Sequence, residues 1–507
     1  MATSLHKKMA PKARKALTPA SIFLRIRPTA TSGSGHTEGA AVQKKLDSWT
    51  ASQVTMQDDD RREKTKYNYT AVVPPEYDNE AAFGQMAPEL IIAWHNDLCN
   101  VLFFTYGQTG SGKTHTMLGV VDSLSSPVPV PGWGNFPRVV HSTLEKMTEW
   151  RKQGVQCTLR VSAIEFYCSA GWDINSEIKA PVKIDVNARI FGAQLTELTS
   201  TEGLAEFISY VYGNRTTAKT LMNNASSRSH CTLVLTLHQL SADGKYHSTF
   251  FSIVDMAGSE RSSKTGGVRM TGMEAGIEAW KMFEAGTPEK LSIGAQGMMI
   301  NNELTFLATE ILKAADMHTK GLPFRAQKEM STAATFYFSA CCDGRARLGV
   351  CLCISQSPQH GYKSWFTLRY AEQLCKCSAP LVRVKPVDFD KALKDAQKAA
   401  DEAAARFAPR AGAPPTGPKA YRVWALQAGQ AGHTAEQLAV LQQLGAERAG
   451  AGLILPPAKA ASAKPLPANQ DEVELVDING EVLPPPVGDA NCNSKASEAE
   501  EPTAVER

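Results

Sequence analysis

The sequence predicts an α/β fold in which a central mixed β-sheet is covered by helices on both faces. The first observation behind this prediction is the alternation of β-rich runs with segments whose apolar residues recur at helical spacing. The second is a glycine-rich segment that directly follows one of the apolar runs. The expected strands are Ser21–Ile26, Val101–Tyr106, Leu159–Tyr167, Thr232–Leu240 and Phe250–Asp255, and the expected helices include Val139–Lys152 and the segment around Leu204–Val211.

The composition of the 507 residues excludes several classes of protein. A hydrophobic content of 43% is enough for a sizeable core, so a wholly disordered chain is excluded. The net charge of +3 gives no reason to expect a nucleic-acid partner. No uninterrupted apolar run reaches about 18 residues, so we expect no membrane span. The eleven cysteines lack the C-x-x-C spacing of a structural zinc site, and we expect reduced, mostly buried thiols.

Four regions separate by composition. Residues 1–20 form a basic N-terminal extension, which can be interpreted as a flexible arm or, less readily because of its prolines, as a transit peptide. Residues 21–380 have ordinary globular composition. Residues 381–410 predict a charged connector and a short alanine-rich helix that lacks the leucine seam of a coiled coil. Residues 411–507 are rich in Ala and Pro and end acidic, so we expect them to be largely disordered, with one short helix near Ala435–Arg448.

The most specific signal is a phosphate-binding loop of the form G-x-x-x-x-G-K-[ST], placed directly after an apolar strand. In such a loop the glycines let backbone N–H groups converge on phosphate oxygens, and the lysine reaches the terminal phosphates. The pattern therefore predicts a P-loop NTPase-type sheet that binds ATP with Mg²⁺, and it favours Thr114 as a ligand of the metal. The residues of the predicted loop are Gly107, Gln108, Thr109, Gly110, Ser111, Gly112, Lys113 and Thr114.

Two further segments narrow the class of P-loop protein. N-N-A-S-S-R-S-H at Asn223–His230 precedes a strand, and D-M-A-G-S-E at Asp255–Glu260 follows one. An aspartate at the end of a strand can hold Mg²⁺ through water, and a glycine three residues later can bond the γ-phosphate. Taken alone, the serine-rich segment is also compatible with an ordinary polar loop. Together with the P-loop, it indicates a switch that closes over phosphate.

These segments resemble the kinesin motor domain family, whose P-loop and two switches appear here in the same order. The similarity extends over about Ser21 to Cys377. Three weaker matches support it: R-I-R-P at Arg25–Pro28, G-N-R at Gly213–Arg215, and L-R-Y-A at Leu368–Ala371.

The resemblance implies a nucleoside side to the site. Arg25 and Pro28 are expected to flank the adenine, with Tyr106 and His115 near it. From the residues alone, two alternatives stay open: Tyr106 as packing at the end of a strand, and His115 as a polar residue on a helix.

The resemblance also implies a metal side and a gate. Ser227 is expected on the magnesium side with Thr114, while Asp255 binds the metal through water. Arg228 and Glu260 are expected to form an ion pair that closes one switch against the other. Gly258 is expected to bond the γ-phosphate. Asn301 corresponds to the asparagine of the family's I-N-x-S-L segment.

Departures from the family concentrate in the segments that, in that family, face the microtubule, the track along which the motor moves. The separation between Arg269 and Ile300 is about two dozen residues longer than is usual in the family, and residues 271–299 fill it. This insertion can be interpreted as a harmless loop or as a segment that changes track binding. Its four acids against three nearby bases favour obstruction of an acidic track. The serine of I-N-x-S-L is Glu303. The family's P-Y-R-D-S-K-L-T-R segment is reduced, although Arg325 and Lys328 remain.

These observations predict a kinesin-like, magnesium-dependent ATPase of the cytoplasm and cytoskeleton that binds microtubules. The lack of heptads predicts a monomer in isolation. A non-motile protein that uses nucleotide to gate microtubule or partner binding is the alternative. A P-loop ATPase without a cytoskeletal role is a third, weaker hypothesis.

Overall fold

The structure is a computed structural model. It describes residues 17–28, 44–58, 62–167, 169–215, 228–259, 271–285, 287, 290–327, 332–357 and 360–450. These residues fall in the first of two units, Met1–Leu453, whereas the second unit, Ile454–Arg507, lies outside the described residues. The basic N-terminal extension, up to residue 16, and the acidic end of the chain therefore remain predictions.

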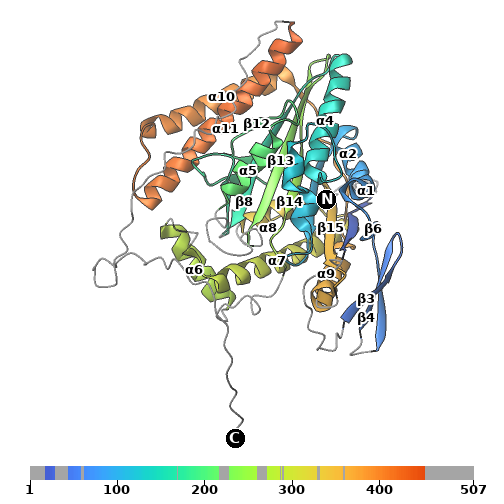
Figure 1. The fold of residues 1–507 in the computed structure, drawn as a ribbon. Coiled ribbons are helices and arrows are strands. Elements are labelled where there is room, and N and C mark those ends of the chain that lie inside the picture. Colours follow the sequence, from blue (N-terminus) through green and yellow to red (C-terminus); the bar gives the residue numbers. More distant parts are fainter. Residues whose placement is uncertain are drawn as a thin grey trace, which may run out of the picture. The chain divides into compact units, whose positions relative to one another are not determined.

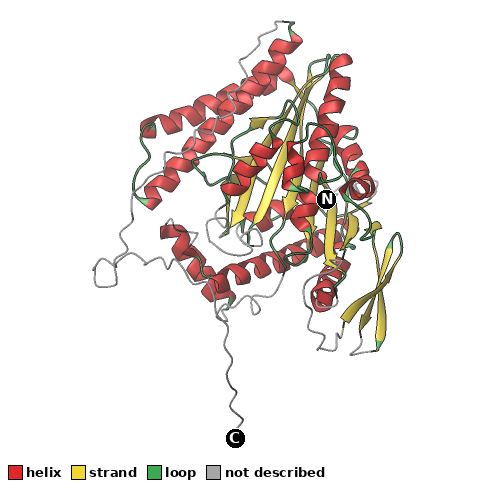
Figure 2. Ribbon diagram, viewed as in Figure 1, coloured by secondary structure: helices red, strands yellow, loops and turns green. Residues whose placement is uncertain are grey.

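A ten-stranded mixed sheet forms the centre of the molecule, as the sequence predicts (Figures 1 and 2). Its main path runs β12-β8-β13-β14-β7-β15-β2-β6. Strands β14, β7, β15, β2 and β6 are mutually parallel, and the β8, β13 and β14 neighbours are antiparallel. The strands are β2 (Ser21–Arg27), β6 (Ala71–Val73), β7 (Asn100–Tyr106), β8 (Gln156–Tyr167), β9 (Ala170–Asp173), β12 (Thr196–Glu197), β13 (His230–Leu240), β14 (Lys245–Asp255), β15 (Ala346–Ser355) and β17 (Val387–Asp388).

Helices cover both faces of this sheet because its strands are apolar on both sides. In β7, Leu102 and Phe104 face one core, and Val101 and Phe103 face the other. The first core is closed by α7 (Ile293–Thr319), α8 (Ala333–Cys341) and α9 (Gly361–Leu374). The second is closed by α1 (Asn79–Met86), α2 (Pro88–His95), α3 (Lys113–Met117), α4 (Asn135–Lys152) and α5 (Leu204–Gly213).

Smaller elements lie around the sheet and the two helical layers that cover it. An antiparallel sheet of three strands projects beside α9 (Figure 1). The described residues also include two short strand pairs and two 3₁₀ turns. These elements are β3 (Lys44–Trp49), β4 (Gln53–Asp58), β5 (Glu63–Asn68), β1 (Thr18–Pro19) with β16 (Ser378–Ala379), β10 (Lys183–Ile184) with β11 (Ile190–Phe191), η1 (Val121–Ser125) and η7 (Ala408–Arg410). No helix among the described residues is both long and apolar enough to cross a membrane.

The insertion forms a helix, α6 (Gly272–Ala285), followed by the first turns of α7. Its small residues Ala275 and Ala279 are buried and pack with Ala295 of α7 and with Tyr167 at the end of β8. Ser292 caps α7 by accepting a hydrogen bond from the Ala295 N–H. The described part of this segment is therefore helical and packed rather than a loop, whereas its effect on track binding, harmless or obstructive, stays a prediction.

The expected alanine-rich helix is present as α10 (Phe389–Phe407), but the expectation for the region after it needs correction. Instead of one short helix in a disordered tail, residues Pro418–Arg448 form a 31-residue helix, α11. It runs beside α10 (Figure 1) and shares a small core with it and with the β13–β14 hairpin. The apolar residues of this core are Leu240, Tyr246, Phe389, Val440, Leu441 and Leu444.

The error has a physical reason. The alanines and glycines of α11 suggest too little apolar area for burial, but they also allow the helix to approach the body closely. A Cβ atom on Gly429 would lie 2.7 Å from the carbonyl oxygen of Gly192. Close approach lets three polar side chains reach backbone groups of the body: Tyr421, His433 and Glu436. Order here comes from tertiary contacts that composition does not record.

Candidate nucleotide-binding site

The glycine-rich loop joins β7 to α3, at the end of a central parallel strand, as the motif predicts. Gly110 and Gly112 have φ values of 77° and 100°, in the left-handed region that favours glycine. A Cβ atom on Gly107 would lie 2.2 Å from the carbonyl oxygen of Cys353 on the neighbouring strand β15. The glycines are thus required by the local geometry as well as by any ligand.

The side chains of the loop fold onto its own backbone. Lys113 is buried, and its Nζ donates to the carbonyl oxygens of Gly107 at 2.9 Å and Gln108 at 3.0 Å. The Ser111 hydroxyl also donates to the Gln108 carbonyl, at 2.8 Å. Thr109 lies in the turn between these residues. The loop therefore holds the lysine amine over the backbone that is expected to wrap the phosphates.

Two of the residues expected on the magnesium side meet, one from the first turn of α3 and one from the end of β14. The Thr114 hydroxyl donates to Oδ2 of Asp255 at 2.7 Å. Asp255 ends β14, where it pairs in parallel register with Thr105 of β7. Its other carboxylate oxygen, Oδ1, is buried without a hydrogen-bond partner among the described residues. A hydroxyl beside a carboxylate with a spare oxygen fits the oxygen ligands that Mg²⁺ prefers. Ser227 lies outside the described residues.

On the predicted nucleoside side, Arg25 and His115 lie close to the loop. The Arg25 guanidinium donates to Asn79 Oδ1 at 2.6 Å and to Thr116 Oγ1 at 3.1 Å, which ties β2 to α1 and α3. Partial desolvation, followed by the charges of Arg25 and Arg27, lowers the pKa of His115. Pro28 follows β2 at the surface. The neighbourhood of these groups is compatible with the expected adenine position, which stays a prediction.

Tyr106 does not belong with that group. Its side chain is on the α7–α9 face of the sheet, whereas Arg25, which alternates with Leu24 and Ile26 of that core, points to the opposite face. Its ring stacks on Tyr370 with centroids 4.1 Å apart and an interplanar angle of 11°. The expectation that Tyr106 lies beside adenine is therefore wrong here, and the alternative of packing at the strand end is confirmed.

The end of the first switch is anchored by a buried polar network. Ser229 donates to Glu165 at 2.7 Å, and Arg215 donates to both the hydroxyl and the carbonyl of Ser229 at 2.8 Å. Arg215 Nε lies 3.7 Å from Glu165, and both side chains are almost fully buried. Sequence reasoning found Arg215 but missed Glu165. The sequence signal for Glu165 was a second charged residue, besides Arg160, within a β-rich run.

The second switch is held at three points. The first is the Thr114–Asp255 bond. The Ala257 N–H donates to Nδ1 of His230 at 3.1 Å, and the Ser259 N–H donates to the Gly107 carbonyl at 3.2 Å. Gly258, the expected γ-phosphate ligand, lies between these two anchored residues.

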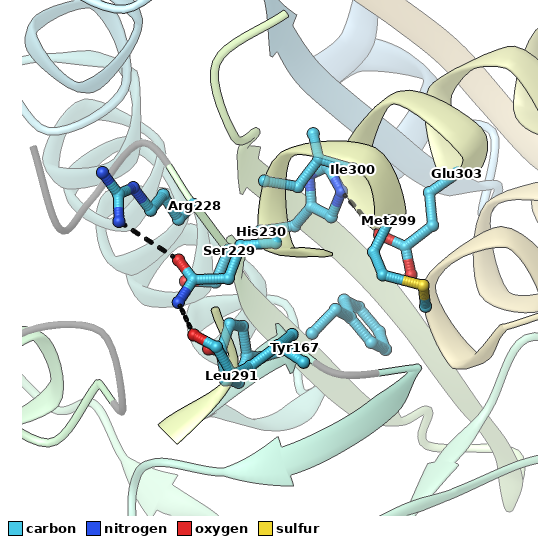
Figure 3. Close-up of a pocket in the computed structure, with 10 residues that line it drawn as sticks. Tyr167, Arg228, Ser229, His230, Leu291, Met299, Ile300 and Glu303 are labelled. Atoms are coloured by element: carbon cyan, nitrogen blue, oxygen red, sulfur yellow. Dashed lines mark hydrogen bonds and ion pairs between the residues drawn. The ribbon is translucent and has the colours of Figure 1, made fainter. Parts of the chain in front are cut away.

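The expected gate is not tested by these contacts. The Arg228 guanidinium donates to Gln296 of α7 at 3.4 Å (Figure 3). Its expected partner, Glu260, lies outside the described residues. Asn301 is on α7, one residue after Ile300. In the altered track-facing segment Arg325 is exposed, whereas Lys328 is not among the described residues.

The layered sheet and the loop at its edge define a P-loop NTPase-type protein. Residues 25–377 match the family model described as the kinesin motor domain. Because the match covers more than half of the chain, the chain belongs to the kinesin motor family.

The curated proteins that are similar in sequence are also kinesins. The chain is 25% identical to carboxy-terminal kinesin 2 of Xenopus laevis over 377 residues, covering 70% of this chain and 52% of the relative. It is 29% identical to the human chromosome-associated kinesin KIF4A over 331 residues, covering 63% of this chain and 24% of the relative. The chain thus spans about half or less of the length of these relatives.

Among solved structures, a KIF14 dimer with AMP-PNP in complex with a microtubule is similar, with a TM-score of 0.58 and 20% identity. The similarity covers 73% of this chain and 97% of the KIF14 chain. A mutant kinesin motor ATPase gives a TM-score of 0.52, covering 71% and 100%. At this identity the likeness shows the fold, and the fold predicted from the sequence is confirmed.

Proposed function

We propose that this chain is a microtubule-associated motor that binds ATP with Mg²⁺ and hydrolyses it. The observation that carries the proposal is the junction of the P-loop with the strand-end aspartate, where Thr114 meets Asp255 and Lys113 lies over the loop. Membership in the kinesin family supports the assignment, and the solved structure of KIF14 in complex with a microtubule supports tubulin as the partner. We place its action on the cytoplasmic cytoskeleton, and we expect a monomer in isolation.

The chain's own residues have distinct tasks in this function. Lys113 binds the terminal phosphates and offsets the charge that develops during attack by water. Thr114 and Ser227, with Asp255 through water, would hold Mg²⁺, which would neutralise charge on the phosphates. Gly258 presents its N–H to the γ-phosphate. Arg228, with Glu260, would close the switches and position the attacking water.

Steady-state ATP turnover with and without microtubules, combined with co-sedimentation, tests this proposal. Stimulation of turnover by microtubules is the expected result. Nucleotide-dependent sedimentation without turnover would replace the motor by a non-motile, nucleotide-gated binding protein. Turnover that ignores microtubules would remove the cytoskeletal role.

A monomer mass in light scattering at micromolar concentration is the companion expectation. It follows from α10, whose apolar residues pack against α11 and the β13–β14 hairpin within the same chain. A dimer mass would show an interface outside the described residues or on a face that these contacts leave open.

A further inference from the structure

Position 303 carries a glutamate where the family's I-N-x-S-L segment has a serine. Glu303 lies on α7, and its side chain is 11% exposed. Its Oε2 is 3.4 Å from Nε2 of His230, the last residue of the first switch, which is 1% exposed (Figure 3). A carboxylate thus faces the imidazole from the helix that follows the insertion.

The contact of His230 with the Ala257 backbone determines which nitrogen of the neutral ring carries the proton. Nδ1 accepts the hydrogen bond of the Ala257 N–H at 3.1 Å, so this nitrogen carries no proton. A neutral imidazole must then carry its proton on Nε2, the atom that faces Glu303. The carboxylate favours this tautomer, because it attracts an N–H and would repel a lone pair. One ring therefore joins α7, the first switch and the second switch.

Neighbouring groups hold the ring in this orientation. Phe338 of α8 contacts it edge-on, with centroids 6.0 Å apart and an interplanar angle of 89°. A second contact lies two residues earlier in the first switch, where Arg228 donates to the side-chain oxygen of Gln296 on α7. The amide nitrogen of Gln296 donates in turn to the Leu291 carbonyl at 2.7 Å. The first half of α7 therefore contacts the first switch at two points, through Gln296 and through Glu303.

We propose that Glu303 is a positioning residue that couples the movement of α7 to the backbone of the second switch through His230. Ala257 directly precedes Gly258, so the bond to the Ala257 N–H restrains the peptide unit next to the one that carries the Gly258 N–H. A shift of α7 moves the carboxylate, the imidazole follows, and the Ala257 hydrogen bond lengthens or breaks. The consequence for ATP turnover rests on the proposed function, but the consequence for the Ala257 amide does not.

Hydrogen exchange of the Ala257 amide tests the junction directly. In Glu303→Ala the Ala257 amide should exchange roughly fivefold faster than in the intact protein, because loss of the carboxylate frees the His230 ring and weakens the Ala257 hydrogen bond by about 1 kcal/mol. Glu303→Gln keeps an oxygen facing Nε2, so the Ala257 amide should exchange nearly as slowly in this variant as in the intact chain. Thr309→Ala, at an exposed position of the same helix, is the control and should leave the amide unaffected.

An unchanged Ala257 exchange rate in Glu303→Ala would overturn the proposal, as would equal effects of the Ala and Gln variants. Should the Ala variant fail to fold, Glu303→Ser, with the family's own residue at this position, replaces it. The Ser variant must show the same faster exchange for the proposal to stand.

Turnover separates positioning from a purely structural role. Microtubule-stimulated kcat should fall about tenfold in Glu303→Ala and recover in Glu303→Gln, while ADP affinity stays within about twofold. A loss of ADP affinity in step with kcat would contradict coupling through the switches. If the intact chain shows no turnover, the proposed function fails, and the exchange measurement still decides whether the junction exists.

Discussion

The phosphate-binding edge and the C-terminal hairpin of α10 and α11 are both well ordered, but they are built in opposite ways. At the edge, the loop bonds join residues five and six positions apart, such as Lys113 with Gln108 and with Gly107. In the hairpin, Glu436 accepts from the Leu195 N–H, and His433 contacts the Ala193 carbonyl, across 241 and 240 positions. The loop itself can be recognised from a short pattern, whereas the attachment of α11 to the body depends on contacts between residues far apart in the sequence.

The hairpin also changes the interpretation of the insertion. Arg422 of α11 donates to the carbonyl of Phe283, stacks over its ring at 4.1 Å, and lies 3.1 Å from Glu284. The insertion therefore contacts a helix that lies after the residues matched by the family model.

The acids of the insertion have local partners. Glu274 accepts from Thr271 and Glu278 from Ser292, while Glu284 is paired with Arg422. Glu289 and Arg269 are not among the described residues. Arg422 neutralises one of the four acids on which the expected obstruction of an acidic track depended, so that expectation loses part of its basis and stays a prediction.

The largest expected effect concerns the phosphate edge alone. Lys113→Ala should lower ATP turnover by about two orders of magnitude or more and weaken ATP binding, because no other charged side chain lies in the loop. The thermal midpoint of unfolding of the hairpin should not move. Lys152→Ala, at the exposed end of α4, is the matched control. Turnover that survives in the Lys113 variant would refute the assignment of this loop.

The next effect concerns the buried pair behind the first switch. Arg215→Met should lower the free energy of unfolding by about 3–5 kcal/mol, because it leaves Glu165 charged and buried. The double variant with Glu165→Gln should lose less than the two single losses combined. The control is Arg383→Met, which removes the exposed ion pair between Arg383 and Asp97, 2.7 Å apart. It should lower the free energy of unfolding by less than about 1 kcal/mol. Equal losses at the two sites would show that burial is not what matters.

The hairpin should respond to a core deletion without affecting the nucleotide site. Leu444→Ala removes a fully buried side chain and should cost about 2–4 kcal/mol, seen as faster amide exchange along α11. Val423→Ala, 42% exposed on the same helix, should change little. Nucleotide affinity should be the same in both variants. A parallel loss of affinity would mean that the two regions are not independent.

The smallest effect is a pH dependence within the hairpin contact. Burial raises the pKa of Glu436 from 4.5 to about 7, so its protonated form favours the folded state. This contribution is present at low pH and is lost as pH rises through about 7. Between pH 6 and 8 the intact chain should therefore lose about 1 kcal/mol of stability relative to Glu436→Gln. Denaturant titrations of both forms at each pH give the difference in their free energies of unfolding, in which the contributions of other titrating groups cancel. A difference that does not change with pH would mean that Glu436 is exposed to water.

Sequence alone determined the features that depend on local chemistry. The glycines of the loop, Lys113 and Thr114 form a pattern because the backbone conformation and the phosphate chemistry both demand those residue types in order. Five strands of the central sheet, β2, β7, β8, β13 and β14, were also predicted from their β-rich runs, whereas the central strand β15 was not. Asp255 could be paired with Thr114 in advance because parallel strands end at one edge.

Tertiary structure alone decided which face each side chain uses and which distant segments meet. Tyr106 faces Tyr370 rather than the nucleoside side because alternation along β7 turns it away from Arg25. Helix α11 is ordered because Gly429 permits close approach to Gly192, a fit that no composition reveals. Glu303 was visible as a departure, but its partner His230 was not, since their contact depends on how α7 packs across the sheet.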